Sequence, residues 1–166
     1  GLDITRAIFM AGRKPYPFME SVNASLYLST NAEQVQEAVA LGYPAGYVLP
    51  CAAVDDEQDE QLRIAFDFDG VLVDDEAEQV FKKTGDLEQF QQYEVANRNR
   101  PLKGGPLMPL LQQLSSFQKM DSQRAQDDSG RKRMLRISIV TARSAPAHER
   151  LNTTLSSLGL EADEVF

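Results

Sequence analysis

Short apolar runs recur along the chain, and the stretches between them carry apolar residues at helical spacing. Such runs, when bounded by glycine, proline and polar residues, are typical of β-strands. The predicted strands cover residues 5–10, 25–28, 46–49, 64–66, 135–140 and 164–166. Because helices are predicted between most of these strands, the order of elements favours an α/β fold with a parallel sheet.

The helical stretches carry start and stop signals. Thr30 and Glu33 form a capping-box pattern before a helix that Gly42 would end. Proline is favoured in the first turn of a helix, so Pro106 and Pro146 mark two further starts. The predicted helices cover residues 18–22, 31–41, 75–83, 87–97, 107–117 and 146–158.

Two polar segments indicate how the chain is divided. The acidic run at residues 55–60 contains no apolar side chain and is typical of a solvated linker, with a partner site as the alternative. Residues 121–133 contain only one apolar side chain, Ala125, which predicts an exposed loop. We therefore expect an α/β segment at residues 1–54, a linker at 55–61 and a second α/β region at 62–166.

Composition excludes several classes of protein. The 166 residues suffice for one domain with a small insert, and no apolar run approaches the roughly 18 residues of a membrane span. The net charge of −8 argues against a nucleic-acid surface, which needs clustered positive charge. Cys51 is the only cysteine, so an intrachain disulfide is excluded, and with no secretory leader visible we expect a cytoplasmic protein.

The candidate chemistry lies where the strand at 64–66 ends. Asp67 and Asp69 follow it one residue apart, and Gly70 allows a sharp turn. Ligands of open parallel sheets bind beyond the carboxyl ends of the strands, so both carboxylates could share one phosphate site. Each pair of like charges at about 4 Å costs roughly 4 kcal/mol at an effective dielectric near 20, which calls for a bound cation and predicts Mg²⁺. A calcium loop counted from Asp67 would need glycine where Leu72 stands.

Two segments together resemble a known superfamily. Asp67-Phe68-Asp69-Gly70-Val71 and Ile139-Val140-Thr141-Ala142-Arg143 are similar to the first two motifs of the haloacid dehalogenase-like phosphotransferases. Residues 63–75, 99–107 and 140–150 resemble, more narrowly, the cytosolic type I 5′-nucleotidases and their bacterial relatives. The resemblance implies a haloacid dehalogenase-like Rossmannoid parallel sheet with helices on both faces. It also implies a core at 62–73 and 134–166 with a small helical cap inserted at 74–133.

The resemblance implies roles for particular residues. Asp67 would attack the phosphorus of a nucleoside 5′-monophosphate and form an aspartyl-phosphate. Asp69 would protonate the leaving oxygen and later accept a proton from water. Thr141, Ala142 and Arg143 would bind the phosphate, and Mg²⁺ would lie on the Asp67 carboxylate and the Asp69 backbone carbonyl.

The same resemblance leaves parts of the site without a source. A working member also supplies a lysine and an acidic pair after later strands, and no such segment follows Phe166. We therefore expect a partial chain, whose residues 1–54 resemble a degenerate back half of a related unit with Ser29 and Thr30 where carboxylates would stand. An inactive fragment or non-catalytic scaffold, with possible self-association, remains an alternative. A phospho-accepting receiver domain is disfavoured because its acids would lie on two strands.

Several further residues carry two interpretations. Arg143 suits either phosphate binding or a surface ion pair, and His148 is more typical of an exposed helical position than of a catalytic base. Asp74 and Asp75 suggest a helix cap. Glu94 could line a base pocket, although a solvated helix face is the simpler interpretation.

Overall fold

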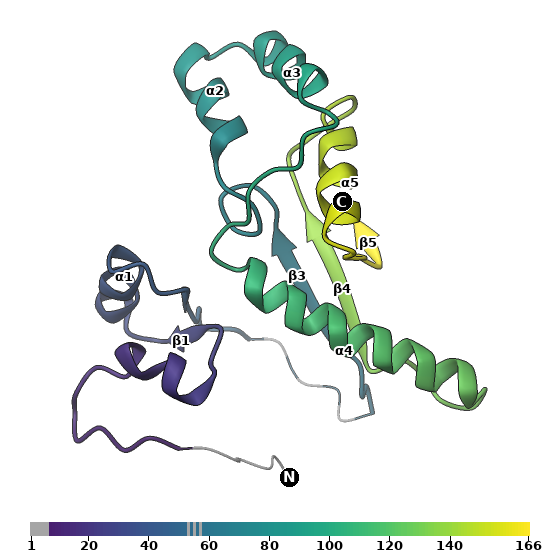
Figure 1. Ribbon diagram of the computed structural model, residues 1–166. Coiled ribbons are helices and arrows are strands. Elements are labelled where there is room, and N and C mark those ends of the chain that lie inside the picture. Colours follow the sequence, from purple (N-terminus) through teal and green to yellow (C-terminus); the bar gives the residue numbers. More distant parts are fainter. Residues whose placement is uncertain (1–6, 53, 55, 57) are drawn as a thin grey trace. The chain divides into compact units, whose positions relative to one another are not determined.

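The computed structural model describes residues 7–52, 54, 56 and 58–166. The chain separates into two compact units, Gly1–Val54 and Asp55–Phe166. Figure 1 shows the elements of both units, which are described separately below.

The first unit is a small β-α-β arrangement. Strands β1 (Tyr27–Ser29) and β2 (Ala45–Tyr47) pair in parallel, and helix α1 (Ala32–Ala40) connects them. Two short 3-10 helices, Tyr16–Phe18 and Glu20–Val22, precede β1. Aromatic rings and small apolar side chains form the core of this unit, which contains Tyr16, Met19, Tyr27, Ala38, Tyr43 and Ala45.

Two predictions for this unit need correction. The cap of α1 is Asn31, whose side chain accepts a hydrogen bond from the Gln34 N–H, so the predicted Thr30 cap is wrong by one residue. The predicted strand at 5–10 lies partly outside the described residues, and residues 7–10 form no strand. Phe9 is 94% exposed there. Its apolar alternation therefore has no partner strand in the described part of the chain.

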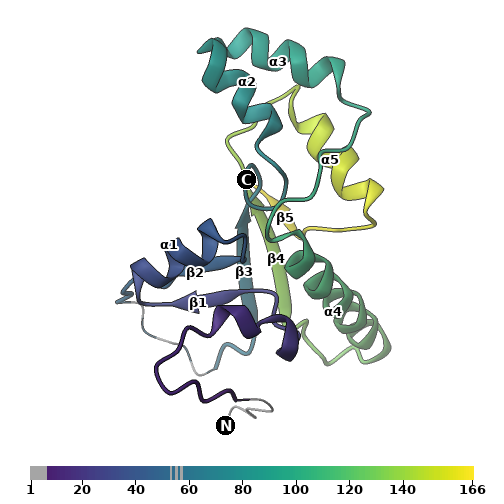
Figure 2. The same ribbon diagram turned by 60° about the vertical axis from the view of Figure 1, so that its left-hand side comes forward.

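The second unit contains a parallel sheet in the order β3-β4-β5, formed by Leu62–Asp67, Leu135–Val140 and Glu164–Val165. The register places Asp67 opposite Val140, so the segments that follow β3 and β4 leave the sheet at one edge. The remaining elements are α2 (Glu76–Thr84), α3 (Leu87–Ala96), α4 (Met108–Asp127) and α5 (His148–Ser157). Figure 2 shows α2 and α3 beyond the end of the sheet at which β3 terminates. The predicted mixed α/β fold with parallel sheets is confirmed.

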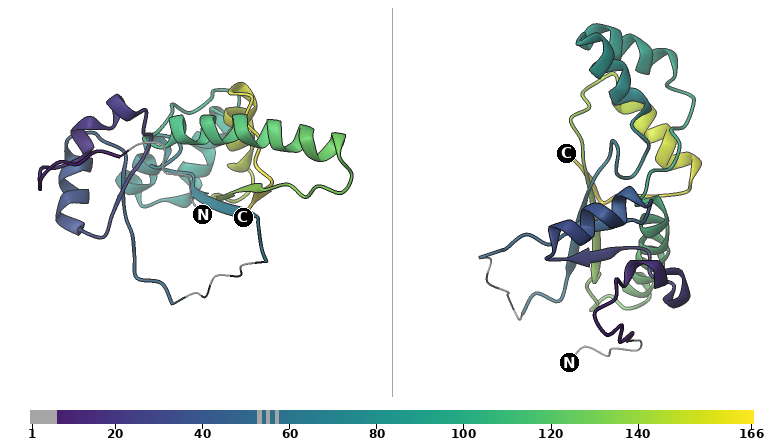
Figure 3. Two further views of the ribbon diagram at one scale, coloured as in Figure 1. Left: turned by 90° about the horizontal axis from the view of Figure 1, so that it is seen from below. Right: turned by 90° about the vertical axis from the view of Figure 1, so that its left-hand side faces the viewer.

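The core of this unit lies on one face of the sheet. Phe66, Ile137 and Ile139 point to the same side and pack with apolar residues of α4 and α5, as the alternation of side chains along a strand requires. Figure 3 shows α4 and α5 on this side. Helices on both faces were predicted, whereas the core of the described second unit involves one face.

Helix α4 is longer than the sequence suggested. It runs through residues 121–127, which were predicted to be loop. Asp121 explains the extension, because its carboxylate accepts hydrogen bonds from the N–H groups of Met134 at 2.6 Å and Leu135 at 3.2 Å and ties the helix to the start of β4. No helix in the described part of the chain is both long enough and apolar enough to cross a membrane.

Candidate active site

The loop after β3 is shaped by its own backbone. Gly70 adopts a positive φ of 74°, which glycine tolerates at little cost. The N–H groups of Leu72 and Val73 both donate to the Phe68 carbonyl, at 3.1 and 3.0 Å. This tight turn fixes Asp69 immediately beyond the end of the strand.

The segment at residues 99–107 binds the same loop through backbone hydrogen bonds. Gly105 donates its N–H to the Leu72 carbonyl at 2.8 Å, and Leu107 donates to the Val71 carbonyl at 3.0 Å. A Cβ on Gly105 would lie 2.7 Å from the Val71 oxygen and 2.6 Å from the Val73 oxygen. Only glycine permits this approach, which explains why a glycine-containing segment at 99–107 accompanies the aspartate loop.

A cavity of about 500 Å³ opens at the carboxyl ends of β3 and β4. The structure brings together four of the predicted site residues there: Asp67, Asp69, Ala142 and Arg143. Helices α2 and α3 supply the opposite wall through Glu78, Phe81, Leu87 and Phe90. The cavity therefore combines a carboxylate pair with an apolar wall.

Arg143 is buried, and its guanidinium is directed at carboxylates. Its Nε lies 2.9 Å from Asp69 Oδ2 and 3.2 Å from Oδ1, while Nη2 lies 2.7 Å from Oδ1. Nη1 donates to Glu94. Burial opposes the charge on this group, but the hydrogen bond and charge of Asp69, with Glu94, raise the pKa of Arg143 above its usual value. Arg143 is thus a buried cation bridging two carboxylates, which neither sequence-based interpretation anticipated.

The bridge continues through Glu94, whose carboxylate is buried. Its second oxygen accepts a hydrogen bond of 2.9 Å from Arg150, a fully buried residue of α5. Arg150 Nη2 lies 3.6 Å from Glu76, which also accepts the Tyr93 hydroxyl. Negative and positive groups therefore alternate from the cavity into the packing of α2, α3 and α5. The predicted solvated position for Glu94 is wrong.

Thr141 lies at the end of β4 beside the cavity residues. Its hydroxyl oxygen accepts the Arg143 N–H at 3.1 Å, and its own N–H donates to the Phe166 carbonyl at 2.8 Å. The hydroxyl proton remains available for a phosphoryl oxygen, because accepting a hydrogen bond does not consume it.

The predicted metal ligands are oxygen atoms, the kind of ligand that Mg²⁺ prefers. Mg²⁺ keeps several waters and is usually held by one or two carboxylates together with substrate phosphate, and Asp67 is an exposed carboxylate. The Asp69 side chain fits less well because both its oxygens accept N–H groups of Arg143, so its contribution would come from its backbone carbonyl. Among the described residues, no three His, Cys, Asp or Glu side chains form a metal-binding group.

Two acidic candidates lie at the start of α2. Asp75 precedes α2 and accepts a hydrogen bond from the Gln79 side chain at 3.0 Å, while Asp74 accepts the Glu76 N–H at 3.4 Å. Asp75 is the N-cap residue of α2, but its side chain makes no capping hydrogen bond.

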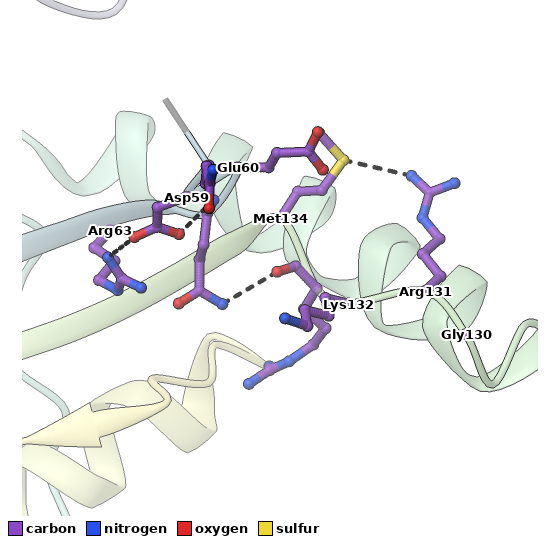
Figure 4. Close-up of a pocket in the computed structure, with 10 residues that line it drawn as sticks. Asp59, Glu60, Arg63, Gly130, Arg131, Lys132 and Met134 are labelled. Atoms are coloured by element: carbon purple, nitrogen blue, oxygen red, sulfur yellow. Dashed lines mark hydrogen bonds and ion pairs between the residues drawn. The ribbon is translucent and has the colours of Figure 1, made fainter. Parts of the chain in front are cut away.

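A second cavity, of about 550 Å³, lies at the opposite end of β3 and β4 and has a basic lining. Figure 4 shows Arg63 against Asp59 and Arg131 extending to Met134. Arg133 pairs with Asp163 at 2.6 Å. Arg63 and Arg133 are therefore already neutralised by carboxylates.

Comparisons with known proteins found sequences similar to this chain. The family model for 5′-nucleotidases matches residues 1–166. The human protein cytosolic 5′-nucleotidase 1B is 36% identical over 170 residues, an alignment that covers 100% of this chain and 27% of that protein. The chain thus spans about a quarter of the length of this relative. No solved structure matches significantly.

Proposed function

The chain belongs to the 5′-nucleotidase family, and from this premise we propose that the full-length protein hydrolyses nucleoside 5′-monophosphates to nucleoside and phosphate with Mg²⁺. The observation that carries the proposal is the exposed Asp67 at the carboxyl end of β3, next to Asp69 in one cavity. A cytoplasmic location belongs to the same proposal and rests on the name of the human relative.

In the first step, a carboxylate oxygen of Asp67 bonds to phosphorus while the bond from phosphorus to the ribose 5′-oxygen breaks. Asp69 gives its proton to that oxygen. Its Oδ2 accepts only one of the Arg143 contacts, at 2.9 Å, which leaves a lone pair to carry the proton. The products of this step are the nucleoside and an aspartyl-phosphate on Asp67.

In the second step, water attacks the phosphorus and loses a proton to Asp69, and the bond to Asp67 breaks. The Thr141 hydroxyl and the backbone near Ala142 would hold the phosphoryl oxygens during both steps. The Asp67 carboxylate and the Asp69 backbone carbonyl would hold Mg²⁺, which when bound would neutralise negative charge on the phosphate. Because Asp67 loses the phosphoryl group and Asp69 regains a proton, both aspartates return to their starting states.

The apolar wall supports a nucleotide rather than a bare phosphate ester as the substrate. The Phe81 and Phe90 rings contact each other edge to face, with centroids 6.5 Å apart, and both line the cavity that contains Asp67. Planar bases bind well against aromatic side chains. This wall does not by itself distinguish one base from another.

The test is phosphate release from a panel of nucleoside 5′-monophosphates, with and without Mg²⁺, by full-length protein. We expect Mg²⁺-dependent release by the wild type and its loss in Asp67→Asn. Asp127→Asn, which changes an exposed carboxylate at the end of α4, is the matched control and should retain wild-type release. Release that survives Asp67→Asn would overturn the nucleophile assignment, and no release by the wild type would favour the scaffold alternative.

A further inference from the structure

We propose that Glu94 is a positioning residue of this site, which fixes Arg143 so that its guanidinium orients the Asp69 carboxylate. This inference rests on the proposed function. Glu94 lies on α3, far in sequence from both Asp69 and Arg143, and its side chain is fully buried. Glu94 does not itself line the cavity, and among the described hydrogen bonds it reaches a lining residue through Arg143.

The Arg143 guanidinium binds two carboxylates through different nitrogen atoms. Nε and Nη2 form a fork on Asp69, whereas Nη1 is directed to Glu94. A guanidinium is planar and rigid, so fixing one edge fixes the direction of the other. Glu94 therefore determines the angle at which the fork meets Asp69.

Glu94 is itself held in place by a second buried arginine. Its other oxygen binds Arg150 Nη1 at 2.9 Å, and Arg150 Nε donates to the Arg100 carbonyl at 2.9 Å. Arg150 is fully buried, and its guanidinium lies 5.7 Å from the centre of the Tyr93 ring. Glu94 thus cannot follow Arg143 if that side chain moves, because α5 anchors it from the opposite side.

Two aromatic rings also lie near the Arg143 guanidinium. Its guanidinium lies 5.3 Å from the centre of the Phe68 ring and 5.8 Å from that of Phe90. These rings restrict its motion but cannot supply the negative charge that a buried cation needs. With Glu94 neutralised, Asp69 would become the only carboxylate bound to Arg143 among the described ion pairs. The Arg143–Asp69 pair would then lose the contact that holds its far side and could shift as a unit.

The consequence is specific to the chemical step. Arg143 contacts Asp69, which handles protons, while the Thr141 hydroxyl and the apolar wall would contact the nucleotide. A misdirected Asp69 slows proton transfer without weakening nucleotide binding, so Glu94 should affect kcat rather than KM.

The test compares Glu94→Gln with Glu88→Gln in full-length protein. Glu88 lies on the same helix, and its exposed side chain contacts Gln92. We expect Glu94→Gln to lower kcat about tenfold or more, since positioned proton transfer contributes at least about a hundredfold. KM should stay within about twofold of wild type. Glu94→Asp keeps the charge at shorter reach and should recover part of the lost kcat. An unchanged kcat in both Glu94 variants would overturn the proposal, as would a change confined to KM.

Coupling to Arg143 separates positioning from a general structural role. Arg143→Lys alone and Glu94→Gln with Arg143→Lys should have nearly equal kcat values, because the lysine cannot form the fork that Glu94 directs. Multiplicative losses in the double variant would contradict the proposal.

An activity-independent measurement distinguishes failure of this inference from failure of the proposed function. In NMR spectra, the Arg143 Nε–H should be protected from exchange with water in the wild type and in Glu88→Gln, and unprotected in Glu94→Gln. Glu94→Asp should show intermediate protection, which keeps the test valid if Glu94→Gln does not fold. Full protection in a folded Glu94 variant would overturn the inference even if the protein hydrolysed no nucleotide.

Discussion

At the scale of single residues, two glycines near Asp69 have different physical roles. Gly70 needs its positive φ of 74°, but a side chain there would meet open space. Gly105 needs the absence of a Cβ, because backbone oxygens of Val71 and Val73 lie where that atom would be. The aspartate loop therefore depends on conformation at one glycine and on close packing at the other.

This difference predicts unequal costs of substitution. Gly105→Ala should lower the free energy of unfolding by about 3 kcal/mol, the upper range for overpacking, because backbone cannot move aside cheaply. Gly70→Ala should cost about 1 kcal/mol, from the strain of a positive φ. Chemical denaturation measures both values. An equal or smaller loss for Gly105→Ala would show that the 99–107 segment does not hold the loop this closely.

Asp163 is a residue whose ionisation supports the fold. Its carboxylate accepts the Ile137 N–H at 2.8 Å and the Gln118 side chain at 2.7 Å, and it pairs with Arg133. Burial alone would raise the pKa of Asp163, but these contacts outweigh burial and hold the pKa below its usual value. Asp163 therefore joins β4, α4 and the loop before β5 through one charged group.

The sign of this shift predicts a pH dependence. The pKa of an aspartate in the unfolded chain is about 3.9. Because the pKa of Asp163 is lower in the folded protein, its ionisation contributes stability at pH values above the unfolded pKa. This stability disappears as the pH falls through the folded pKa. Asp163→Asn should thus be about 2 kcal/mol less stable than wild type at pH 7. The difference should shrink below about pH 4. Thermal unfolding across this range checks it, and a constant difference would contradict the ionic contribution.

At the scale of elements, the side chains of α4 that pack against the sheet are not all the ones that hydrophobicity would select. Leu111 is 1% exposed and belongs to the core with Ile137 and Ile139, whereas Phe117, the last residue of the helix predicted at 107–117, is 61% exposed. The polar residues Ser115 and Gln118 are buried instead. Gln118 is buried because its amide reaches Asp163, a contact that hydrophobic periodicity does not encode.

Substitutions on α4 should follow burial rather than hydrophobicity. Leu111→Ala should lower the free energy of unfolding by about 2–5 kcal/mol through loss of contacts and a residual cavity. Phe117→Ala should change it by less than about 0.5 kcal/mol in the described second unit. Denaturation of both variants tests this ranking, and a larger loss for Phe117→Ala would place a packing partner over that side chain.

The elements also show the limit of sequence-based prediction. Strand β4 was predicted with its observed bounds, because its apolar residues alternate strongly and turn residues flank it. The start of α1 was displaced by one residue, since Thr30 and Asn31 are both good caps and only geometry selects between them. The buried ion pairs could not be predicted, because the paired residues are separated by 49 positions for Glu94 and Arg143, 56 for Glu94 and Arg150, and 74 for Asp69 and Arg143.

At the scale of the whole molecule, a series of ion pairs connects the cavity at the end of β3 to helices α2, α3 and α5 of the second unit. Asp69, Arg143, Glu94, Arg150 and Glu76 alternate in sign from the cavity to α2, and every cation has a carboxylate on either side. Removing one member of a buried pair typically costs about 3–5 kcal/mol. The network is therefore sensitive to single substitutions even at positions that do not line the cavity.

The central claim is that Asp67 becomes transiently phosphorylated. The most direct measurement mixes full-length protein with Mg²⁺ and a nucleoside 5′-monophosphate carrying labelled phosphate, and stops the reaction with acid within one turnover. We predict that label remains on the wild-type protein in a linkage that hydroxylamine cleaves, and that Asp67→Asn retains none. Label on Asp67→Asn, or turnover by the wild type with no labelled protein at any time, would contradict the account.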